Sequence, residues 1–372
     1  MSDYGVNTSF VLRAIEEVVF EDRPVPELGP RDVLVEVKKT GICGSDVHYL
    51  LHGRIGDFIV EKPMVLGHES AGIVYKVGSK VKHLKPGARV AMEPGATCRV
   101  CEPCKHGRYE LCADIEFAAT PPYDGTLARY YRVPADLAYE LPETLSLEDG
   151  AMMEPLAVGI HSVSNLAQVR ANQVVAVFGA GPVGLLCMAV AKALGARRVI
   201  GIDIQQSRLD FAKSYAANDV FMPGPLKEGE KRMDYSRRTA QEMKEKLNIA
   251  DAGPDGVDVV IEATGAEVCI QTGYFLAKSG GMFVQVGMGS PEVQVPITLI
   301  LVKELVVKGS FRYGPGDYAL AIALVAQGKI DLKPLVTHRF KFDEAKKAFH
   351  TARDGKSEDG VSVIKAIIDG PE

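Results

Sequence analysis

The stretch Val174–Leu194, VVAVFGAGPVGLLCMAVAKAL, decides the fold of the middle of this 372-residue chain. It begins with five apolar residues, passes through the glycine-rich sextet Gly179–Gly184 and continues as an apolar run that reaches Lys192 before meeting a charge. An apolar run followed by G-x-G-x-x-G and a helical pattern is typical of a strand, a turn and a helix that bind a dinucleotide. Three glycines and Pro182 argue against a membrane span here, because a helix in lipid must satisfy its own backbone hydrogen bonds.

The residues of the sextet have distinct expected roles. Gly179 makes the tight turn, Gly181 lets the backbone approach a pyrophosphate, and Gly184 allows the helix to pack closely on the strand. Pro182 and Val183 open the helix, whose free N–H groups and dipole favour the negative charge of the phosphates.

An acidic residue is expected about twenty positions after the glycines, and Asp203 closes the apolar run Arg198–Ile202. Its carboxylate would accept hydrogen bonds from the adenosine ribose and repel a 2′-phosphate, which favours NAD over NADP. The alternative is that Asp203 only caps the helix predicted from Ser207. Arg208 lies over the adenine or is an ordinary solvated helix residue.

The organisation of the chain changes near residue 155. Before it, short alternating runs such as Asp32–Lys38 and Ala71–Val77 are punctuated by glycine and proline, which predicts an irregular β-rich domain. After it, apolar strands alternate with helical patterns up to Met282–Val286, which predicts a doubly wound parallel sheet. Beyond about residue 310 the pattern predicts two helices and two strands without showing which domain they join.

Composition and charge are those of a globular chain long enough for two or three domains. Apolar residues make up 47% and charged residues 24%, and the net charge of −5 gives no general attraction to nucleic acid or anionic membranes. Met1–Arg13 lacks the basic and apolar regions of a secretory signal, so we expect a cytoplasmic protein.

Four cysteines with the spacing C-x2-C-x2-C-x7-C predict a closed structural zinc site. In a reducing compartment such clustering is more often a metal site than a disulfide framework. An iron–sulfur cluster and four free thiols are the alternatives. The four residues are Cys98, Cys101, Cys104 and Cys112.

A second group is spread along the first domain and predicts a catalytic zinc. Cys43 lies in Gly41–Asp46, and His68 and Glu69 follow Gly67. Alone, they could be a buried cysteine and a loop histidine. Together, a thiolate, an imidazole and a carboxylate form a mixed ligand set that leaves room for water or substrate.

These motifs, taken in order with Glu154-Pro155, resemble the zinc-dependent medium-chain dehydrogenases over nearly the whole chain. The segments Cys43–Tyr49, Ala118–Gly125 and Lys308–Tyr313 resemble the polyol branch, in which the xylitol dehydrogenases are the best match and the sorbitol dehydrogenases come next. The resemblance implies a GroES-like catalytic domain at 1–156, a Rossmann NAD-binding domain inserted at 157–309, and a segment 310–372 that completes the catalytic domain. It also places the active site between the two domains.

The resemblance further implies roles for individual residues. Cys43, His68 and Glu69 match the catalytic zinc ligands, and Glu154 matches a carboxylate that contacts zinc-bound water or substrate, so which glutamate binds the metal at each step stays open. Ser45 and His48 form a proton relay, unless His48 is only a polar loop residue. The substrate positions are Tyr49, Phe117, Glu154, Arg312 and Tyr313. The further cofactor positions are Val183, Arg208, Val286, Gly287, Met288, Ser310, Phe311 and Arg312.

The expected function is NAD-dependent oxidation of a polyol to a ketose, with two zinc ions per chain in a homotetramer. Xylitol is the leading substrate, and sorbitol or L-arabinitol is the alternative. A nucleotide-binding relative without catalytic activity would be expected to lack Cys43, His68 or Glu154, and all three are present.

Overall fold

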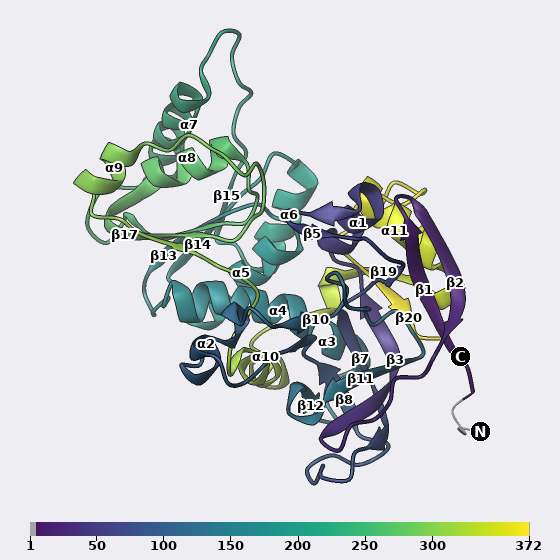
Figure 1. Ribbon diagram of the computed structural model, residues 1–372. Coiled ribbons are helices and arrows are strands. Elements are labelled where there is room, and N and C mark those ends of the chain that lie inside the picture. The colour runs from purple at the N-terminus through teal and green to yellow at the C-terminus, as the bar shows by residue number, and fades with distance from the viewer. Residues whose placement is uncertain (1–4, 372) are drawn as a thin grey trace. The chain divides into compact units, whose positions relative to one another are not determined.

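The computed structural model describes residues 5–371, which divide into two compact units (Figure 1). One unit combines the chain up to Glu154 with the chain from Gly314 onward, and the other is Pro155–Tyr313. Along the sequence, the second unit is therefore an insertion in the first. We call them the β-rich unit and the dinucleotide unit.

The β-rich unit is built mainly from short strands. Its strands are β1 (Asn7–Ala14), β2 (Glu17–Arg23), β3 (Asp32–Gly41), β4 (Arg54–Ile55), β5 (Phe58–Ile59), β6 (Met64–Val65), β7 (Glu69–Val77), β8 (Arg89–Met92), β9 (Gly95–Ala96), β10 (Glu116–Phe117), β11 (Tyr130–Pro134), β12 (Ala138–Glu140), β19 (Val336–Phe340) and β20 (Lys365–Asp369). Its helices are α1 (Gly44–His52), α2 (Glu102–Lys105), α3 (Leu147–Ala151), α10 (Asp317–Ala326) and α11 (Ala345–Asp354). Helix α4 (Met153–Ile160) begins here and continues into the dinucleotide unit.

The central strand of the main sheet is β3, which pairs with β7, β11 and β20. The order along the sheet is β12-β8-β7-β3-β20-β19, with β11 beside β3. Strand β20 runs antiparallel to β3 and brings the end of the chain into a sheet formed by its beginning. Phe10, Leu66 and Phe349 are fully buried in a core that joins the same two parts of the sequence.

The dinucleotide unit is a six-stranded parallel sheet covered by helices (Figure 1). Its strands are β13 (Val174–Phe178), β14 (Arg198–Ile202), β15 (Asp219–Phe221), β16 (Val257–Glu262), β17 (Ala277–Gln285) and β18 (Val306–Gly309). Its helices are α5 (Pro182–Ala193), α6 (Gln206–Tyr215), α7 (Arg232–Leu247), α8 (Glu267–Leu276) and α9 (Ile297–Val302). In the order β15-β14-β13-β16-β17-β18, the chain first adds strands on one side of β13 and then continues with β16 on its other side, as in doubly wound nucleotide-binding sheets. The predicted fold class is confirmed.

Several elements differ from the sequence prediction. Strand β17 begins at Ala277, whereas the pattern predicts a strand only from Met282, because Lys278–Gly281 contributes polar and flexible residues that obscure an apolar run. The last strand begins at Lys365, whereas the β-branched residues from Val361 onward predict an earlier start, at Val361. Helix α1 has no sequence prediction, because its Gly44-Ser45-Asp46 start has the composition of a loop.

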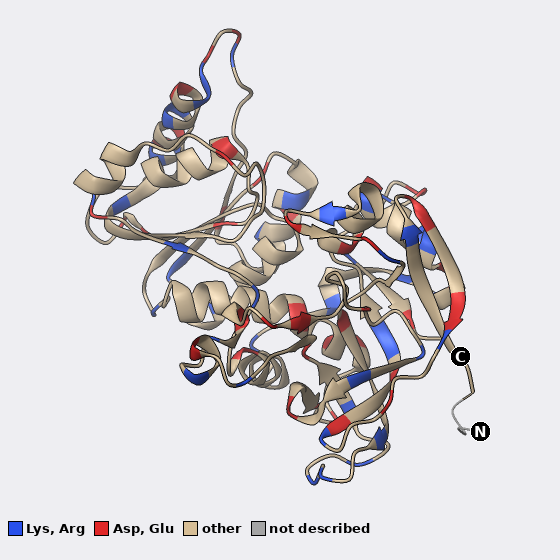
Figure 2. Ribbon diagram, viewed as in Figure 1, with Lys and Arg blue, Asp and Glu red and all other residues tan. Residues whose placement is uncertain are grey.

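Charged residues of both signs occur along α7. Figure 2 shows acidic and basic positions interspersed on this helix. Within residues 5–371, no helix combines the length and the apolar character needed to cross a membrane.

Candidate functional site

The three donors of the predicted catalytic zinc site come from two chain turns beside strand β3. Cys43 is the N-cap of α1, and His68 and Glu69 lie where the chain enters β7. Gly41 at the end of β3 pairs with Glu69 in the antiparallel register, which brings the turns together. One ligand atom from each of Cys43, His68 and Glu69 lies within 4.8 Å of the others. A sulfur, a nitrogen and an oxygen this close fit a zinc ion with an open fourth position.

Gly41 is required by the space that the Glu69 carboxylate occupies. A Cβ atom at position 41 would lie 2.2 Å from Glu69 Oε2. His68 and Glu69 are buried, whereas Cys43 is partly exposed. Of the three donors, Cys43 is therefore the one that small molecules can reach from solvent. The Glu69 carboxylate has no room to move toward Gly41 on β3.

Asp46 holds the imidazole of His68. Its Oδ2 lies 3.3 Å from His68 Nδ1, and its two oxygens also accept the backbone N–H groups of Gly67 and Cys43. Burial disfavours the imidazolium, but Asp46 and Cys43 raise the pKa of His68 well above its usual value. A carboxylate on Nδ1 favours the tautomer that leaves Nε2 as a metal donor.

Lys365 on β20 holds the carboxylate of Glu69. Its Nζ donates to both oxygens at 2.7 Å and to the backbone oxygen of Ile42 at 3.1 Å. Both side chains are almost fully buried. Burial opposes the charge, but Glu69 raises the pKa of Lys365 above its ordinary value. A carboxylate oxygen has a second lone-pair site, so this ion pair leaves Glu69 able to accept a cation.

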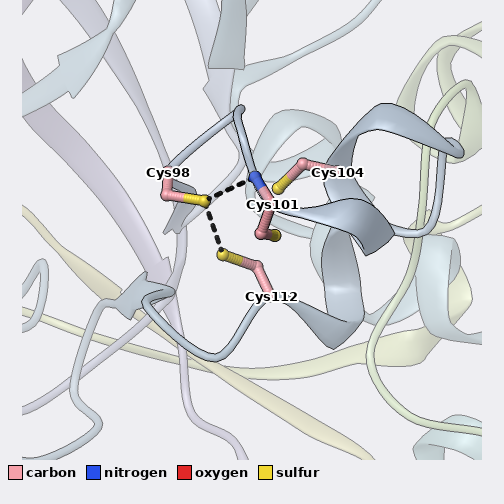
Figure 3. A group of neighbouring side chains, drawn as sticks. All are labelled: Cys98, Cys101, Cys104 and Cys112. Carbon is pink, nitrogen blue, oxygen red and sulfur yellow. Dashed lines mark hydrogen bonds between the residues drawn. The ribbon is translucent and has the colours of Figure 1, made fainter.

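The four cysteines of the loop between β9 and β10 form the second donor cluster. Their sulfur atoms lie within 4.8 Å of one another, and Figure 3 shows the four side chains converging. Cys98 Sγ accepts a hydrogen bond from the backbone N–H of Cys101 at 3.3 Å, and backbone N–H groups lower the pKa of Cys98 to about 7. Thiolates at these separations can surround a tetrahedral zinc at about 2.3 Å from each sulfur.

A buried carboxylate connects the cysteine loop to the main sheet. Glu93 follows β8 and is 2% exposed. Its oxygens accept hydrogen bonds from the hydroxyl groups of Tyr109, in the cysteine loop, at 2.5 Å and Tyr139, on β12, at 2.8 Å. Burial raises the pKa of Glu93 to about 7. The cysteine loop is therefore attached to the sheet through a group that titrates near neutral pH.

The cysteine loop also ends beside the predicted catalytic zinc site. Strands β9 and β10 are antiparallel partners on either side of the loop, with Gly95 opposite Phe117 and Ala96 opposite Glu116. The ring of Phe117 lies 5.9 Å from that of His68. Phe117 therefore lines the surroundings of the Cys43, His68 and Glu69 set.

In the dinucleotide unit, the glycine-rich turn has the geometry that its sequence predicts. Gly179 has φ of +93°, which side chains rarely tolerate, and Gly181 is the N-cap of α5. A Cβ atom on Gly184 would lie 1.8 Å from the backbone oxygen of Gly179. The start of α5 can therefore approach the turn closely, and its N–H groups are available to an anion.

Asp203 is bonded to the glycine-rich turn and is not the N-cap of the next helix. Its Oδ2 accepts the N–H of Ala180 at 2.8 Å and its Oδ1 that of Gln205 at 2.9 Å, while Gln205 itself is the N-cap of α6. Arg208 Nη1 lies 3.8 Å from Asp203 Oδ2. The carboxylate thus lies at the edge of the turn, with a guanidinium beside it.

The last residues of five strands form one row across the parallel sheet. The row runs through Ile202, Phe178, Glu262, Gln285 and Gly309. The predicted cofactor residues follow four of these positions, at the carboxyl edge where such sheets bind ligands. They are Gly179–Gly184, Asp203, Val286–Met288 and Ser310–Arg312.

The remaining predicted residues are distributed over both units. Glu154 is buried at the start of α4 and lies outside the set of donors within 4.8 Å, although its charge contributes to the raised pKa of Lys365. In α1, Ser45 is partly exposed, His48 is exposed and Tyr49 is buried. Burial and the nearby His52 lower the pKa of His48.

Arg312 and Tyr313 close the dinucleotide unit. Arg312 adopts a left-handed backbone with φ of +55°, and its guanidinium lies 4.7 Å from the centre of the Phe311 ring. Tyr313 is buried.

Comparisons with known proteins bear on both units. Residues 29–143 match the profile of the alcohol dehydrogenase GroES-like domain, and residues 182–327 match that of the zinc-binding dehydrogenases. The chain is 54% identical over 365 residues to a protein of Aspergillus clavatus described as "Probable D-xylulose reductase A", covering 98% of this chain and 97% of that protein. It is also 54% identical over 364 residues to D-xylulose reductase A of Aspergillus niger, with the same coverage.

The chain belongs to the zinc-dependent medium-chain dehydrogenases. Its structure is similar to that of L-idonate 5-dehydrogenase from Escherichia coli K-12, with a TM-score of 0.84, 27% identity and 98% of each chain covered. The predicted family is confirmed, and with it the use of zinc and NAD that the family implies.

Three residues of this dehydrogenase that hold its site together have no predicted role in the sequence. Asp46 lies in a quoted motif, but its contact with His68 depends on the fold. Lys365 is 296 residues from Glu69, and the only sequence signal is a charge within the apolar strand Lys365–Asp369. Glu262 has the same signal at the end of Val257–Glu262.

Proposed function

We propose that this chain oxidises a secondary hydroxyl of a polyol to a ketone, with xylitol and D-xylulose as the substrate pair and NAD as the hydride acceptor. Its relatives named D-xylulose reductase match it over nearly its full length, which supports this substrate pair. The observation that carries the proposal is the cluster of Cys43, His68 and Glu69 within 4.8 Å, a mixed ligand set of the kind used for zinc catalysis.

On the metal side, Cys43, His68 and Glu69 would hold the catalytic zinc, and Cys98, Cys101, Cys104 and Cys112 a structural zinc. When bound, the catalytic zinc supplies Lewis acidity that eases deprotonation of an alcohol near neutral pH. Asp46 keeps the donor nitrogen of His68 directed at the site, and Lys365 fixes Glu69 and balances its charge. We assign Glu69 rather than Glu154 to the metal, since only Glu69 lies within the donor cluster.

On the cofactor side, the turn Gly179–Gly184 with Pro182 and Val183 would receive the pyrophosphate at the start of α5. Asp203 accepts hydrogen bonds from the adenosine ribose, and its negative charge disfavours a 2′-phosphate. Arg208 lies beside that carboxylate and would contact the adenine. When bound, NAD supplies the hydride acceptor.

The substrate and the proton would be handled by residues from both parts of the sequence. Tyr49, Phe117, Glu154, Arg312 and Tyr313 bind the polyol, and a guanidinium suits a chain of hydroxyl groups because it offers five donors. Ser45 and His48 carry the released proton toward solvent, and the exposure of His48 supports its place at the outer end of this relay.

We assign catalysis to a domain formed by residues 1–156 and 310–372, and NAD binding to residues 157–309. The two compact units support these assignments to within a few residues.

We also propose a cytoplasmic homotetramer. Strand β18 is the last strand of its sheet, and its Val306 and Val307 are 45% and 44% exposed. In the neighbouring α9, Ile297 and Leu301 are more exposed still. An unpaired apolar strand edge invites pairing with a second copy of itself, which joins two chains, and a second interface between two such pairs would complete the tetramer. Light scattering should give the mass of four chains, and Val307→Lys should reduce it.

Initial rates test the proposed reaction. NADH formation is measured with xylitol, sorbitol and L-arabinitol, with NAD and with NADP, before and after chelation and again after zinc is restored. We expect the highest kcat/KM with xylitol and NAD, loss of activity on chelation and recovery with zinc.

Each other outcome identifies a different error. A higher kcat/KM with sorbitol or L-arabinitol would show that the proposed substrate is wrong and that the proposed reaction type is right. Absence of NADH formation with all three polyols, in protein that binds NADH, would indicate a nucleotide-binding relative without this activity. Full activity in protein shown to be free of metal contradicts the role of Cys43, His68 and Glu69.

A further inference from the structure

The row of residues at the carboxyl edge of the parallel sheet contains one position without an assigned role. Ile202, Phe178, Gln285 and Gly309 are each followed by residues assigned to the cofactor. Glu262 occupies the middle of this row, between Phe178 and Gln285, and its side chain is completely buried. A buried charge at the centre of a binding edge requires an account of what holds it.

The Glu262 carboxylate accepts hydrogen bonds from the turn after β16 and from Gln285, the last residue of β17. Oε1 accepts the N–H of Thr264 at 2.9 Å and also the Thr264 hydroxyl. Oε2 accepts the N–H of Gly265 at 2.8 Å and the side-chain amide of Gln285 at 2.7 Å. The same Gln285 amide donates to the backbone oxygen of Gly287 at 2.7 Å. One carboxylate therefore links the turn after β16 to the loop after β17.

The hydrogen-bond partners of Glu262 require both of its carboxylate oxygens to be acceptors. Three of its four partners are N–H groups, which cannot accept a hydrogen bond. Within residues 5–371, Glu262 forms no ion pair. Its charge is thus balanced only by oriented neutral donors, and the position of each donor is defined by the carboxylate.

The two loops are also packed backbone against backbone. A Cβ atom on Gly265 would lie 2.3 Å from the carbonyl carbon of Met288, and one on Gly289 would lie 2.0 Å from the Gly265 oxygen. On the other side, a Cβ atom on Gly179 would lie 3.0 Å from Thr264 Cγ2. A displacement of Thr264 and Gly265 would therefore be transmitted to the glycine-rich turn and to the Val286–Met288 loop.

We propose that Glu262 is a positioning residue for the nicotinamide cofactor, whose carboxylate fixes the Thr264–Gly265 turn and the Val286–Met288 loop in the arrangement that binds NAD. The inference rests on the proposed NAD-dependent function and adds a residue to it. Glu262 acts through these loops and not by contact with the reacting atoms.

The variant Glu262→Gln tests this role at nearly constant volume. A glutamine keeps one acceptor oxygen, but its amide group faces either the two N–H donors at Oε2 or the N–H and hydroxyl of Thr264 at Oε1, so at least one N–H donor loses its acceptor. A buried donor left without an acceptor destabilises the local structure, so the two loops should separate on that side. We expect the Kd for NADH to rise by about tenfold or more.

Asp258→Asn is the matched control. Asp258 is a carboxylate on the same strand, four residues earlier, where it accepts the N–H of Val174 at 2.7 Å and pairs with Lys278 at 2.5 Å. Its removal also takes a charge from β16, but at a distance from the carboxyl edge. It should lower the unfolding temperature without changing the Kd for NADH.

The readout is the fluorescence of NADH during titration, which is simple to isolate because the chain contains no tryptophan. In Glu262→Gln, the Kd for NADH and the KM for NAD should rise together while kcat at saturating NAD stays within about threefold of wild type. Gln285→Met, which removes one donor and no charge, should raise the Kd about threefold and decides the matter if Glu262→Gln does not fold.

The outcomes separate this inference from the proposed function. Wild-type protein that fails to bind NADH would refute the proposed function itself. If Glu262→Gln binds NADH as tightly as wild type does, the role of Glu262 is overturned and the proposed function is left intact. The same holds if Asp258→Asn weakens NADH binding as much as Glu262→Gln does. In the same way, an unchanged Kd in Gln285→Met would contradict the link between the two loops.

Discussion

Replacing Glu93 by glutamine should make the protein more stable at pH 8 and leave its stability unchanged near pH 5. Burial raises the pKa of Glu93 from 4.5 to about 7 in the folded chain. Between these values the folded state binds more protons than the unfolded state, so the free energy of unfolding falls as the pH rises. Above about pH 7 the folded protein contains a buried, ionised carboxylate that accepts hydrogen bonds from two tyrosine hydroxyl groups.

The magnitude follows from the two pKa values. Each pKa unit corresponds to about 1.4 kcal/mol, so the interval from 4.5 to about 7 amounts to about 3 kcal/mol. Glutamine resembles the protonated carboxyl group, because it can donate to one of Tyr109 and Tyr139 and accept from the other. The difference in unfolding temperature between Glu93→Gln and wild type should therefore grow from at most about 1 °C at pH 5 to roughly 4 °C at pH 8 for a chain of this length.

Thermal unfolding followed by circular dichroism from pH 5 to 8 measures this difference, in which contributions from other titrating groups cancel. Glu148→Gln is a control of opposite sign. The Arg339 guanidinium, at 2.8 Å from each oxygen of Glu148, lowers the pKa of that carboxyl group. That variant should be less stable than wild type at pH 7, with the gap closing as the pH falls. A constant difference for Glu93→Gln across the range, or a loss of stability at pH 8, would refute the reasoning.

Three further substitutions address the metal and cofactor sites. Asp203→Ser should lower the ratio of kcat/KM for NAD to that for NADP by about tenfold or more, because it removes a negative charge and frees Arg208, 3.8 Å away, for a phosphate; an unchanged ratio would remove Asp203 from the ribose contact. His68→Ala should reduce turnover by about a thousandfold or more while NADH still binds, since the metal is expected to contribute several kcal/mol to the reaction; activity near that of wild type would exclude a zinc role for His68. Cys104→Ser should reduce the zinc content from two ions to one per chain in elemental analysis and lower the unfolding temperature, and two retained ions would show that this cluster is not the second zinc site.

Local sequence was sufficient where neighbouring residues along the chain also form the contact. The turn Gly179–Gly184 lies within one strand–helix connection, and the four cysteines lie within one loop, so their spacing predicts their geometry. The fold class could be predicted for the same reason, because each strand–helix repeat of the parallel sheet carries its own apolar pattern.

Contacts between distant segments could not be predicted in this way. The pairing of Lys365 with Glu69 depends on the antiparallel arrangement of β20 beside β3, which no local pattern specifies. The hydrogen bonds that Ala180 donates to Asp203 and that Gln285 donates to Glu262 likewise depend on strand register. Sequence therefore predicted the groups that would bind metal and cofactor better than the groups that orient them.

The pairing of β9 with β10 brings together the two ends of the segment that contains the four clustered cysteines. Because Ala96 and Glu116 are already opposite each other in an antiparallel ladder, a tight turn could join them directly and omit everything between. Such a shortened chain would lose the Tyr109 hydroxyl that donates to Glu93. The hydrogen bond from the Ala118 N–H to the Pro94 oxygen would remain and would keep the neighbouring Phe117 beside His68. Gain or loss of this segment would therefore change the unfolding temperature and leave Cys43, His68 and Glu69 in place.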